Sequence, residues 1–263
     1  MRRRIFFSKP ILLLVLAPLL PGNCCLQAED DPFPTGPEAG RKLAEELRAI
    51  KPDESANWHG VLKLFGRIPK RLPVPISCEL IVSKTNWTVT YVTTPTDTNL
   101  AEKFTIVFST NAPNQYFYAR GATPGAMPGE PKQISAAEAD LPLAGSDFWL
   151  SDLGLEFLHW PEQLRLKGDI GSGRGRYVLI STNPHPAPGG YSRVKTWIDK
   201  QTDQPTEAEA YGADKTNRVV KSFSLEKLAK VDGRYQVKEM DINGKGRFWT
   251  RLEIEVEGDK KKN

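Results

Sequence analysis

Residues 248–256 read FWTRLEIEV, and large apolar side chains alternate with polar or charged ones along this stretch. An alternation with a period of two predicts a β-strand that buries one face in the core and leaves the other face in water. The buried face would hold Phe248, Thr250, Leu252, Ile254 and Val256, and the wet face would hold Trp249, Arg251, Glu253 and Glu255.

The same period recurs along most of the chain, so the sequence predicts a mainly β protein. Turn sequences such as residues 214–217 (DKTN), 232–233 (DG) and 243–244 (NG) separate many of the strands. Because short connections make consecutive strands antiparallel, we expect a meander of hairpins with no internal domain boundary. The predicted strands lie near residues 58–66, 74–83, 86–93, 103–109, 115–120, 163–168, 175–182, 191–199, 206–212, 218–226, 232–242 and 246–257.

Residues 145–161, GSDFWLSDLGLEFLHWP, do not follow this period. Apolar side chains at helical spacing predict a helix that Ser146 or Asp147 caps, that Gly154 weakens and that ends before Pro161. Such an apolar element cannot lie on water. It either completes the core of a curled sheet or forms a movable lid over a ligand cavity, and the periodicity allows both. Its apolar face holds Trp149, Leu150, Leu153, Phe157 and Trp160.

The start of the chain predicts export. Residues 1–10 are short and basic, residues 11–20 (ILLLVLAPLL) are apolar, and a small-residue stretch ends at Ala28, which is typical of a secretory signal peptide cleaved after that residue. The apolar run is too short for a membrane anchor. No small residue precedes Cys24 or Cys25, which makes lipid attachment at either cysteine the less favoured alternative.

The mature chain would then begin with a polar, proline-rich leader over residues 29–36. Residues 37–50 (PEAGRKLAEELRAI) predict one amphipathic helix with proline at its start and Lys51-Pro52 as a stop. Cleavage leaves Cys78 as a lone cysteine, which we expect to be a small buried hydrophobe on a strand.

The charge balance excludes two classes of partner. The 263 residues hold 36 basic and 32 acidic side chains, but residues 1–28 carry four of the basic ones and none of the acidic ones. The rest of the chain is therefore neutral. A basic field that would attract nucleic acid or anionic lipid is not expected.

Several short motifs occur along the chain in a characteristic order and spacing. They are Gly145–Phe148 followed by Asp152-Leu153, Trp197–Asp199 with Thr202 and Pro205, Glu209–Tyr211 before Asp214, and Thr250–Ile254. Together these motifs resemble the LolA-like family of periplasmic lipoprotein carriers, also called outer-membrane lipoprotein-sorting proteins. The resemblance implies an incomplete antiparallel β-barrel of about eleven strands with helices over its open side. It covers a single domain over residues 37–258, followed by a charged tail at 259–263.

The function that this resemblance implies is a monomeric periplasmic carrier, not an enzyme, that shelters the acyl chains of lipoproteins or other lipids. An inner-membrane donor and an outer-membrane acceptor would be its partners, and no cofactor or metal is implied. In well-known carriers a basic residue near the early strands holds the lid closed. Arg67 and Arg71 lie in that region here, but the divergent loop 67–75 assigns neither of them this role.

A carrier of acyl chains needs a continuous apolar cavity of at least several hundred Å³ under residues 146–160. The strands should line it with their apolar faces, and the lid with its own. The expected lining is Trp87, Val89, Tyr91, Phe104, Ile106, Phe108, Phe248, Leu252 and Ile254 from the strands, with Phe148, Trp149, Leu150, Leu153 and Phe157 from the lid.

Catalytic sites are poorly supported by the sequence. The three histidines, His59, His159 and His185, have no metal-site spacing, and no GxSxG motif is present. Residues 171–175 (GSGRG) lack the lysine of a phosphate loop and predict a hairpin turn. The alternative function is a secreted β-rich module with a filled core that binds a protein or a polysaccharide on its surface.

Overall fold

The computed structural model describes residues 15–16, 34–67, 70–95, 100–110, 112–171, 174–213, 218–231, 234–244, 246 and 248–255. Ala28, Cys24 and Cys25 lie outside the described residues, as do the leader up to residue 33, the turns at 214–217 and 232–233, Val256 and the tail at 259–263. The expectations for these parts of the chain stay predictions.

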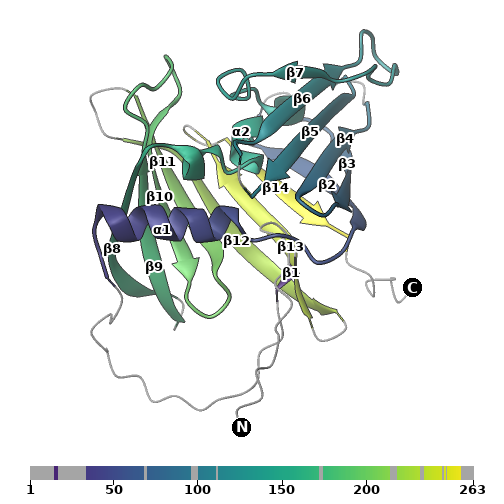
Figure 1. Ribbon diagram of the computed structural model, residues 1–263. Helices are drawn as coiled ribbons and strands as arrows, with labels where there is room; N and C mark the ends of the chain where they lie inside the picture. The colour runs from purple at the N-terminus through teal and green to yellow at the C-terminus, as the bar shows by residue number, and fades with distance from the viewer. Residues whose placement is uncertain are drawn as a thin grey trace.

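One antiparallel sheet dominates the described part of the chain. Its strands follow the order β7-β6-β5-β4-β3-β2-β14-β13-β12-β11-β10-β9-β8, and β1 pairs with β13 beside this path. The end strands β7 and β8 are not paired with each other, so the sheet curls without closing (Figure 1). This confirms the predicted incomplete barrel. The strands are β1 (Val15–Leu16), β2 (Ala56–Phe65), β3 (Val74–Val82), β4 (Asn86–Thr93), β5 (Glu102–Ser109), β6 (Gln115–Arg120), β7 (Lys132–Ile134), β8 (Glu162–Gly171), β9 (Arg174–Thr182), β10 (Tyr191–Asp199), β11 (Gln204–Gly212), β12 (Val219–Val231), β13 (Arg234–Asn243) and β14 (Trp249–Ile254).

The strand predictions agree closely with these bounds, since every predicted segment overlaps one strand. The predicted hairpin at residues 171–175 is also confirmed, because Gly171 at the end of β8 pairs with Arg174 at the start of β9. Two short strands were not predicted: β1, whose two residues lie in the apolar run of the predicted signal peptide, and β7, whose three residues are too few to show a period.

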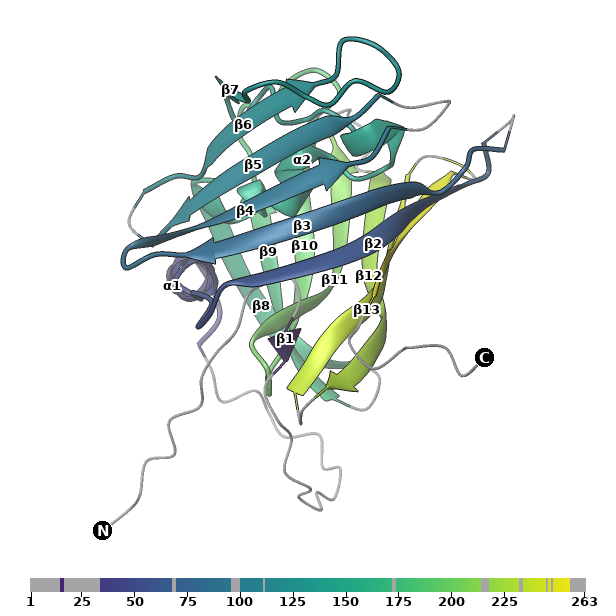
Figure 2. The same ribbon diagram turned by 90° about the vertical axis from the view of Figure 1, so that its right-hand side faces the viewer.

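The connectivity explains how the open side is covered. Strands β2 to β7 form one meander and β8 to β14 a second, and the two join where β2 pairs with β14. The link from β7 to β8 must therefore pass from one edge of the sheet to the other. The two halves of the sheet face each other, with the helix α2 (Leu150–Leu153) between them (Figure 2).

We call residues 143–160 of this link the covering segment. It holds a short 3-10 helix η1 (Leu143–Gly145), then α2, then a second 3-10 helix η2 (Glu156–His159). The prediction of one helix capped by Ser146 or Asp147 is therefore wrong. Asp147 Oδ2 accepts a hydrogen bond from Thr250 Oγ1 on β14 at 2.7 Å, so the predicted capping side chain makes a tertiary contact instead. Leu155 has a left-handed φ of 50°, which ends the helical path.

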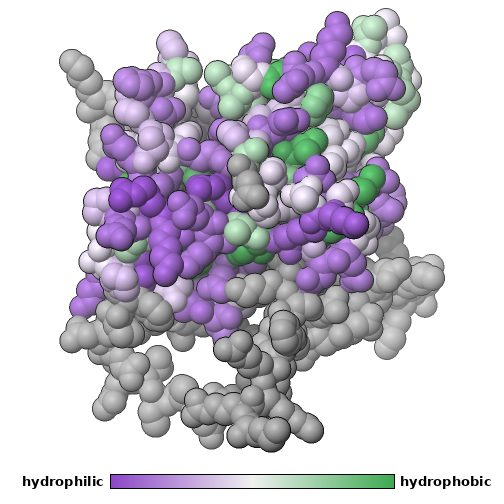
Figure 3. Space-filling model, viewed as in Figure 1, coloured by the Kyte–Doolittle hydropathy of each residue, from purple (hydrophilic) through white to green (hydrophobic). Residues whose placement is uncertain are grey.

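The amino-terminal helix α1 (Pro37–Arg48) confirms the prediction and lies beside β8 and β9 on the inner side of the curled sheet. It buries one face against η2 and β9, while its solvent face in Figure 3 is mostly hydrophilic. Gly40 allows a close approach, since a Cβ there would lie 2.6 Å from the backbone of Gln163. Just before the helix, Gly36 exchanges two backbone hydrogen bonds with Arg165 of β8, at 2.8 and 3.1 Å.

Two clusters of buried apolar side chains lie inside the curl. The larger one joins β2 to β6, β13 and β14 with the covering segment, and it includes stacked rings of Tyr91, Phe104 and Tyr116. The smaller one joins α1 and η2 to β9, β10 and β11. The two clusters meet at the covering segment, which contributes side chains to both. No helix among the described residues has the length and apolar composition needed to cross a lipid bilayer.

Candidate functional site

The inner wall formed by β10, β11 and β12 is built from small side chains at its centre. Thr196 of β10 pairs with Ala208 of β11, and in the next inward-facing row Val194 pairs with Ala210. Paired residues in a sheet point to the same face, so these four side chains lie side by side on the inner wall. Because they are short, they leave space between the wall and the covering segment.

That space is a cavity of about 90 Å³ with a mainly apolar lining. Side chains of the covering segment close one side of it, and strands β10 to β13 form the rest. Its lining is Phe148, Asp152, Leu153, Leu155, Phe157, Tyr191, Val194, Thr196, Gln204, Pro205, Ala208, Ala210, Lys221, Ser222, Phe223, Leu225, Val237, Met240 and Ile242.

A second cavity of about 40 Å³ lies across the covering segment, between α1, η2 and strands β2, β4 and β5. Leu153 and Leu155 line both cavities, so the covering segment separates them. The expectation of one continuous cavity of several hundred Å³ is wrong for this conformation, because the covering segment occupies the middle of the curl. Moving it outward would join the two cavities and add the volume that it vacates.

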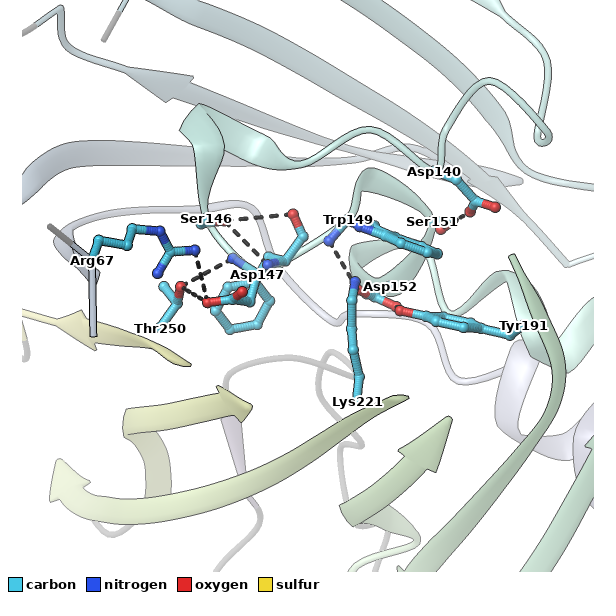
Figure 4. A network of polar contacts seen from close by, with 11 residues as sticks. Arg67, Asp140, Ser146, Asp147, Trp149, Ser151, Asp152, Tyr191, Lys221 and Thr250 are labelled. Carbon is cyan, nitrogen blue, oxygen red and sulfur yellow. Dashed lines mark hydrogen bonds and ion pairs between the residues drawn. The ribbon is translucent and has the colours of Figure 1, made fainter. Parts of the chain in front are cut away.

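An ion pair joins the covering segment to the wall. Lys221 of β12 points inward and its Nζ lies 3.0 Å from Asp152 Oδ2, with both side chains largely buried (Figure 4). The hydroxyl of Tyr191 donates to the other oxygen of Asp152 at 3.1 Å. The Trp149 ring stacks on Tyr191 at 4.6 Å between centroids, and Lys221 Nζ lies 3.6 Å from the Trp149 centroid. Burial lowers the pKa of Lys221, and Asp152 opposes that effect.

A second ion pair holds the start of the covering segment. Arg67, in the loop after β2, lies 3.0 Å from Asp147 Oδ2, and Thr250 Oγ1 donates to the same oxygen at 2.7 Å (Figure 4). Arg67 also donates to the carbonyl of Gly145 at 3.3 Å. A basic residue near the early strands thus contacts the covering segment, which is the arrangement that the family resemblance implies. The sequence alone could not choose between Arg67 and Arg71.

Buried carboxyl groups fix the rest of the covering segment. Glu102 of β5 accepts a hydrogen bond from Ala144 N at 2.7 Å, and Asp140 accepts one from Ser151 Oγ at 2.6 Å. The Tyr116 hydroxyl of β6 donates to Glu156. Burial raises the pKa of Glu102, Asp140 and Glu156 above the ordinary carboxyl value, and the hydrogen bonds only partly offset it. The segment is therefore held from both halves of the sheet.

Residues 86–256 match a family model that is described as an uncharacterized protein. The match spans more than half of the chain. The chain belongs to this family. Its sequence matches no curated protein.

Solved structures share the fold. A DUF1329 family protein from Desulfovibrio piger has a TM-score of 0.65 and 18% identity over 83% of this chain and 90% of that chain. A putative outer membrane lipoprotein-sorting protein domain from Vibrio parahaemolyticus has a TM-score of 0.62 and 18% identity. The match covers 86% of this chain and 95% of that chain. A LolA superfamily protein from Nitrosomonas europaea has a TM-score of 0.52 and 15% identity. The match covers 84% of this chain and 92% of that chain. These likenesses confirm the predicted LolA-like fold.

The LolA-like fold divides the predicted lining residues into groups. Phe148, Leu153 and Phe157 line the larger cavity. The smaller cavity is lined by Trp87, Val89, Tyr91 and Phe108, again with Leu153. Phe104, Ile106, Leu150, Leu252 and Ile254 are buried in the larger cluster but line neither cavity. Whether any of these side chains binds a ligand stays a prediction.

Two predicted lining residues lie elsewhere. Trp149 is half-buried against Tyr191 and Lys221, at the rim of the cavity. Phe248 is 43% exposed, and the prediction that it faces the interior is wrong. Strand β14 begins only at Trp249, and the Phe248 ring lies under the Arg67 guanidinium at 5.6 Å instead.

Lys221 and Thr196 were not among the predicted lining residues, although the sequence holds a signal for each. Lys221, Phe223 and Leu225 are spaced two residues apart on β12, and all three face the interior. A charged residue is unusual at such a position. Thr196 stands between Val194 and Ile198 on the inner face of β10. Both are polar residues at positions that the alternation assigns to the interior.

The structure places the candidate reactive groups among the described residues. No group of three or more His, Cys, Asp or Glu side chains is placed there to hold a metal ion. Cys78 is buried on β3, as expected, and burial raises the pKa of its thiol well above the ordinary value. A thiol that keeps its proton is a weak nucleophile.

Proposed function

We propose that this chain is a periplasmic carrier that shelters acyl chains of lipoproteins or other lipids on their way towards the outer membrane. One observation carries the proposal: the covering segment separates two apolar cavities and is held over them by ion pairs to the sheet. Two solved structures that share the fold, a putative lipoprotein-sorting protein domain and a LolA superfamily protein, support the same function.

The transfer energy explains why a carrier is needed. Removing an acyl chain from water is favourable by about 0.8 kcal/mol per methylene, or roughly 12 kcal/mol for a chain of about 16 carbons. A lipid therefore leaves a membrane only if another apolar site receives it. Binding and release in such a site make and break no covalent bond, so the proposed carrier is not an enzyme and needs no cofactor.

The closed cavities are smaller than the 300 to 1,000 Å³, roughly, of ordinary ligand sites. Uptake therefore requires the covering segment to move, and the two ion pairs set how readily it does so. The segment is not one long helix but three short pieces with a left-handed residue between two of them. Such pieces can shift without unfolding the sheet.

Native mass spectrometry of the purified protein, followed by lipid extraction, tests this proposal. We expect a bound lipid mass, or displacement of a fluorescent fatty acid by added lipid. A clean unliganded mass with no displacement of the probe would contradict the carrier function.

A second candidate is a surface-binding module. A hollow of about 670 Å³ lies on the outer face of β2 to β6, and polar side chains such as Asn57, His59, Glu79 and Lys103 line it. A polysaccharide or protein segment would bind there without any movement of the covering segment. Binding of such a partner by a protein that takes up no lipid would favour this function.

A further inference from the structure

Thr196 carries an unpaired hydroxyl on the wall of the larger cavity. The residue is fully buried, and its Oγ1 has no hydrogen-bond partner among the residues that the structure describes. On the inner face of β10 it stands between Val194 and Ile198, which are both apolar. Across the sheet its neighbours are Leu179 of β9 and Ala208 of β11, which offer no hydrogen-bonding side chain.

A buried hydroxyl without a partner destabilises the folded protein, and such groups are rare in native structures. Valine has nearly the same shape as threonine and would fill this position without that penalty. The polar atom therefore has no structural use in the closed protein. It points to a ligand that supplies the missing hydrogen bond.

The rest of the lining indicates what that ligand is. The polar groups of the lining are Thr196, Gln204, Ser222, the Tyr191 hydroxyl and the Lys221–Asp152 ion pair. Tyr191 already donates to Asp152, and the charges of the ion pair neutralise each other. A ligand here is thus mainly hydrocarbon with one hydrogen-bonding group. In an acyl chain that group is the carbonyl oxygen, which accepts but cannot donate, whereas a threonine hydroxyl can donate.

We propose that Thr196 Oγ1 donates a hydrogen bond to the carbonyl oxygen of a bound acyl group, so that the site distinguishes acyl chains from plain hydrocarbons. This inference rests on the proposed carrier function. The neighbouring inward row, two residues along β10, runs from Val194 through Ala210 to Lys221. That row is about 7 Å away along the strand, so a carbonyl bound at Thr196 would lie one inward row from Lys221 and the covering segment.

Binding of methyl decanoate, decanoate and decane to the wild type, Thr196→Val and Thr196→Ser tests the proposal. The readout is displacement of a fluorescent fatty acid. We expect Thr196→Val to weaken binding of the two carbonyl ligands by about three- to tenfold, which is the size of one neutral hydrogen bond. Decane binding should not change, and Thr196→Ser should behave as the wild type. Preference for the ester over the acid would indicate an esterified lipid, and the reverse would indicate a free fatty acid.

The thermal midpoint of the unliganded variants gives an independent readout. Thr196→Val should unfold at the same temperature as the wild type or at a higher one, because it removes an unpaired polar atom. A lower midpoint, or equal weakening of all three ligands, would overturn the role of Thr196. So would unchanged binding of the carbonyl ligands, while the carrier function would stand. Failure of the wild type to bind any of the three would instead count against the carrier function itself.

Discussion

The ammonium of Lys221 lies 3.0 Å from the carboxylate of Asp152, and this contact joins the wall of the larger cavity to the segment that covers it. The same carboxylate accepts a hydrogen bond from the N–H of Trp149 at 2.8 Å, so it also fixes the first turn of α2. Loss of the cation would leave a carboxylate in apolar surroundings with only neutral hydrogen-bond donors.

Replacement of Lys221 by methionine should therefore loosen the covering segment. We expect a loss of about 2 kcal/mol in the free energy of unfolding, because removing one partner of a mostly buried ion pair strands the other. Uptake of an apolar fluorescent dye should increase. Urea denaturation and dye titration measure the two effects, and Lys132→Met on exposed β7 is the control. Wild-type dye uptake in Lys221→Met would show that this ion pair does not hold the segment.

Locking the covering segment to β14 should block ligand uptake. The Thr250 hydroxyl contacts both the backbone N–H of Asp147, at 3.0 Å, and its carboxylate, at 2.7 Å, so we place cysteines at both positions, with Cys24, Cys25 and Cys78 replaced. A free-thiol assay shows whether the disulfide has formed. The oxidised variant should exclude the fluorescent fatty acid, and reduction should restore binding. Equal binding in the two redox states would mean that ligands enter without movement of this segment.

A larger side chain on the wall of the cavity should lower lipid uptake without lowering the stability of the fold. Ala208→Leu adds three carbons to a side chain that lines the larger cavity. We expect lipid uptake to fall at least tenfold while the thermal midpoint stays within a few degrees, since overpacking costs about 1–3 kcal/mol at most sites and the free volume offsets it here. Ala122→Leu in an exposed loop is the matched control. A variant that binds lipid normally would place the ligand elsewhere.

Acid should weaken the contact between η2 and α1 through His159. Burial lowers the pKa of His159 to about 4, and the nearby Arg48 charge acts in the same direction. The unfolded chain takes up this proton near pH 6.5 but the folded chain does not. His159 therefore contributes stability above pH 6.5 that is lost as the pH falls towards 4. Urea denaturation at pH 7 and pH 5 should show a smaller pH dependence for His159→Gln than for the wild type, and an identical dependence would contradict this role.

The strands could be predicted because their signal is local. In β14 the side chains of Thr250, Leu252 and Ile254 are buried, and the residues between them are more exposed. This is the alternation that the sequence predicts. The path of the covering segment could not be predicted, because it depends on distant partners. Asn114 Nδ2 donates to the carbonyl of Gly154 at 2.8 Å, next to Leu155 with its left-handed backbone. The sequence of residues 145–161 does not predict that contact.

The candidate site could be predicted only in part, for a similar reason. Periodicity identifies which side chains face inward, and most of the predicted lining residues do. It does not tell which inward side chains stand opposite one another. The hollow exists because Thr196 pairs with Ala208 and Val194 with Ala210, and that register is set by the folded sheet.

The two unpaired rims of the curled sheet have a consequence for behaviour in a crowded compartment. Exposed strand edges recruit strands from other molecules and so seed fibrils. Here one edge strand is β7, which is only three residues long. The other is β8, whose Arg165 forms two backbone hydrogen bonds with Gly36. Trimming the chain beyond Gly36 would remove both hydrogen bonds and expose the backbone of β8 at Arg165, so we expect the shortened chain to aggregate more readily.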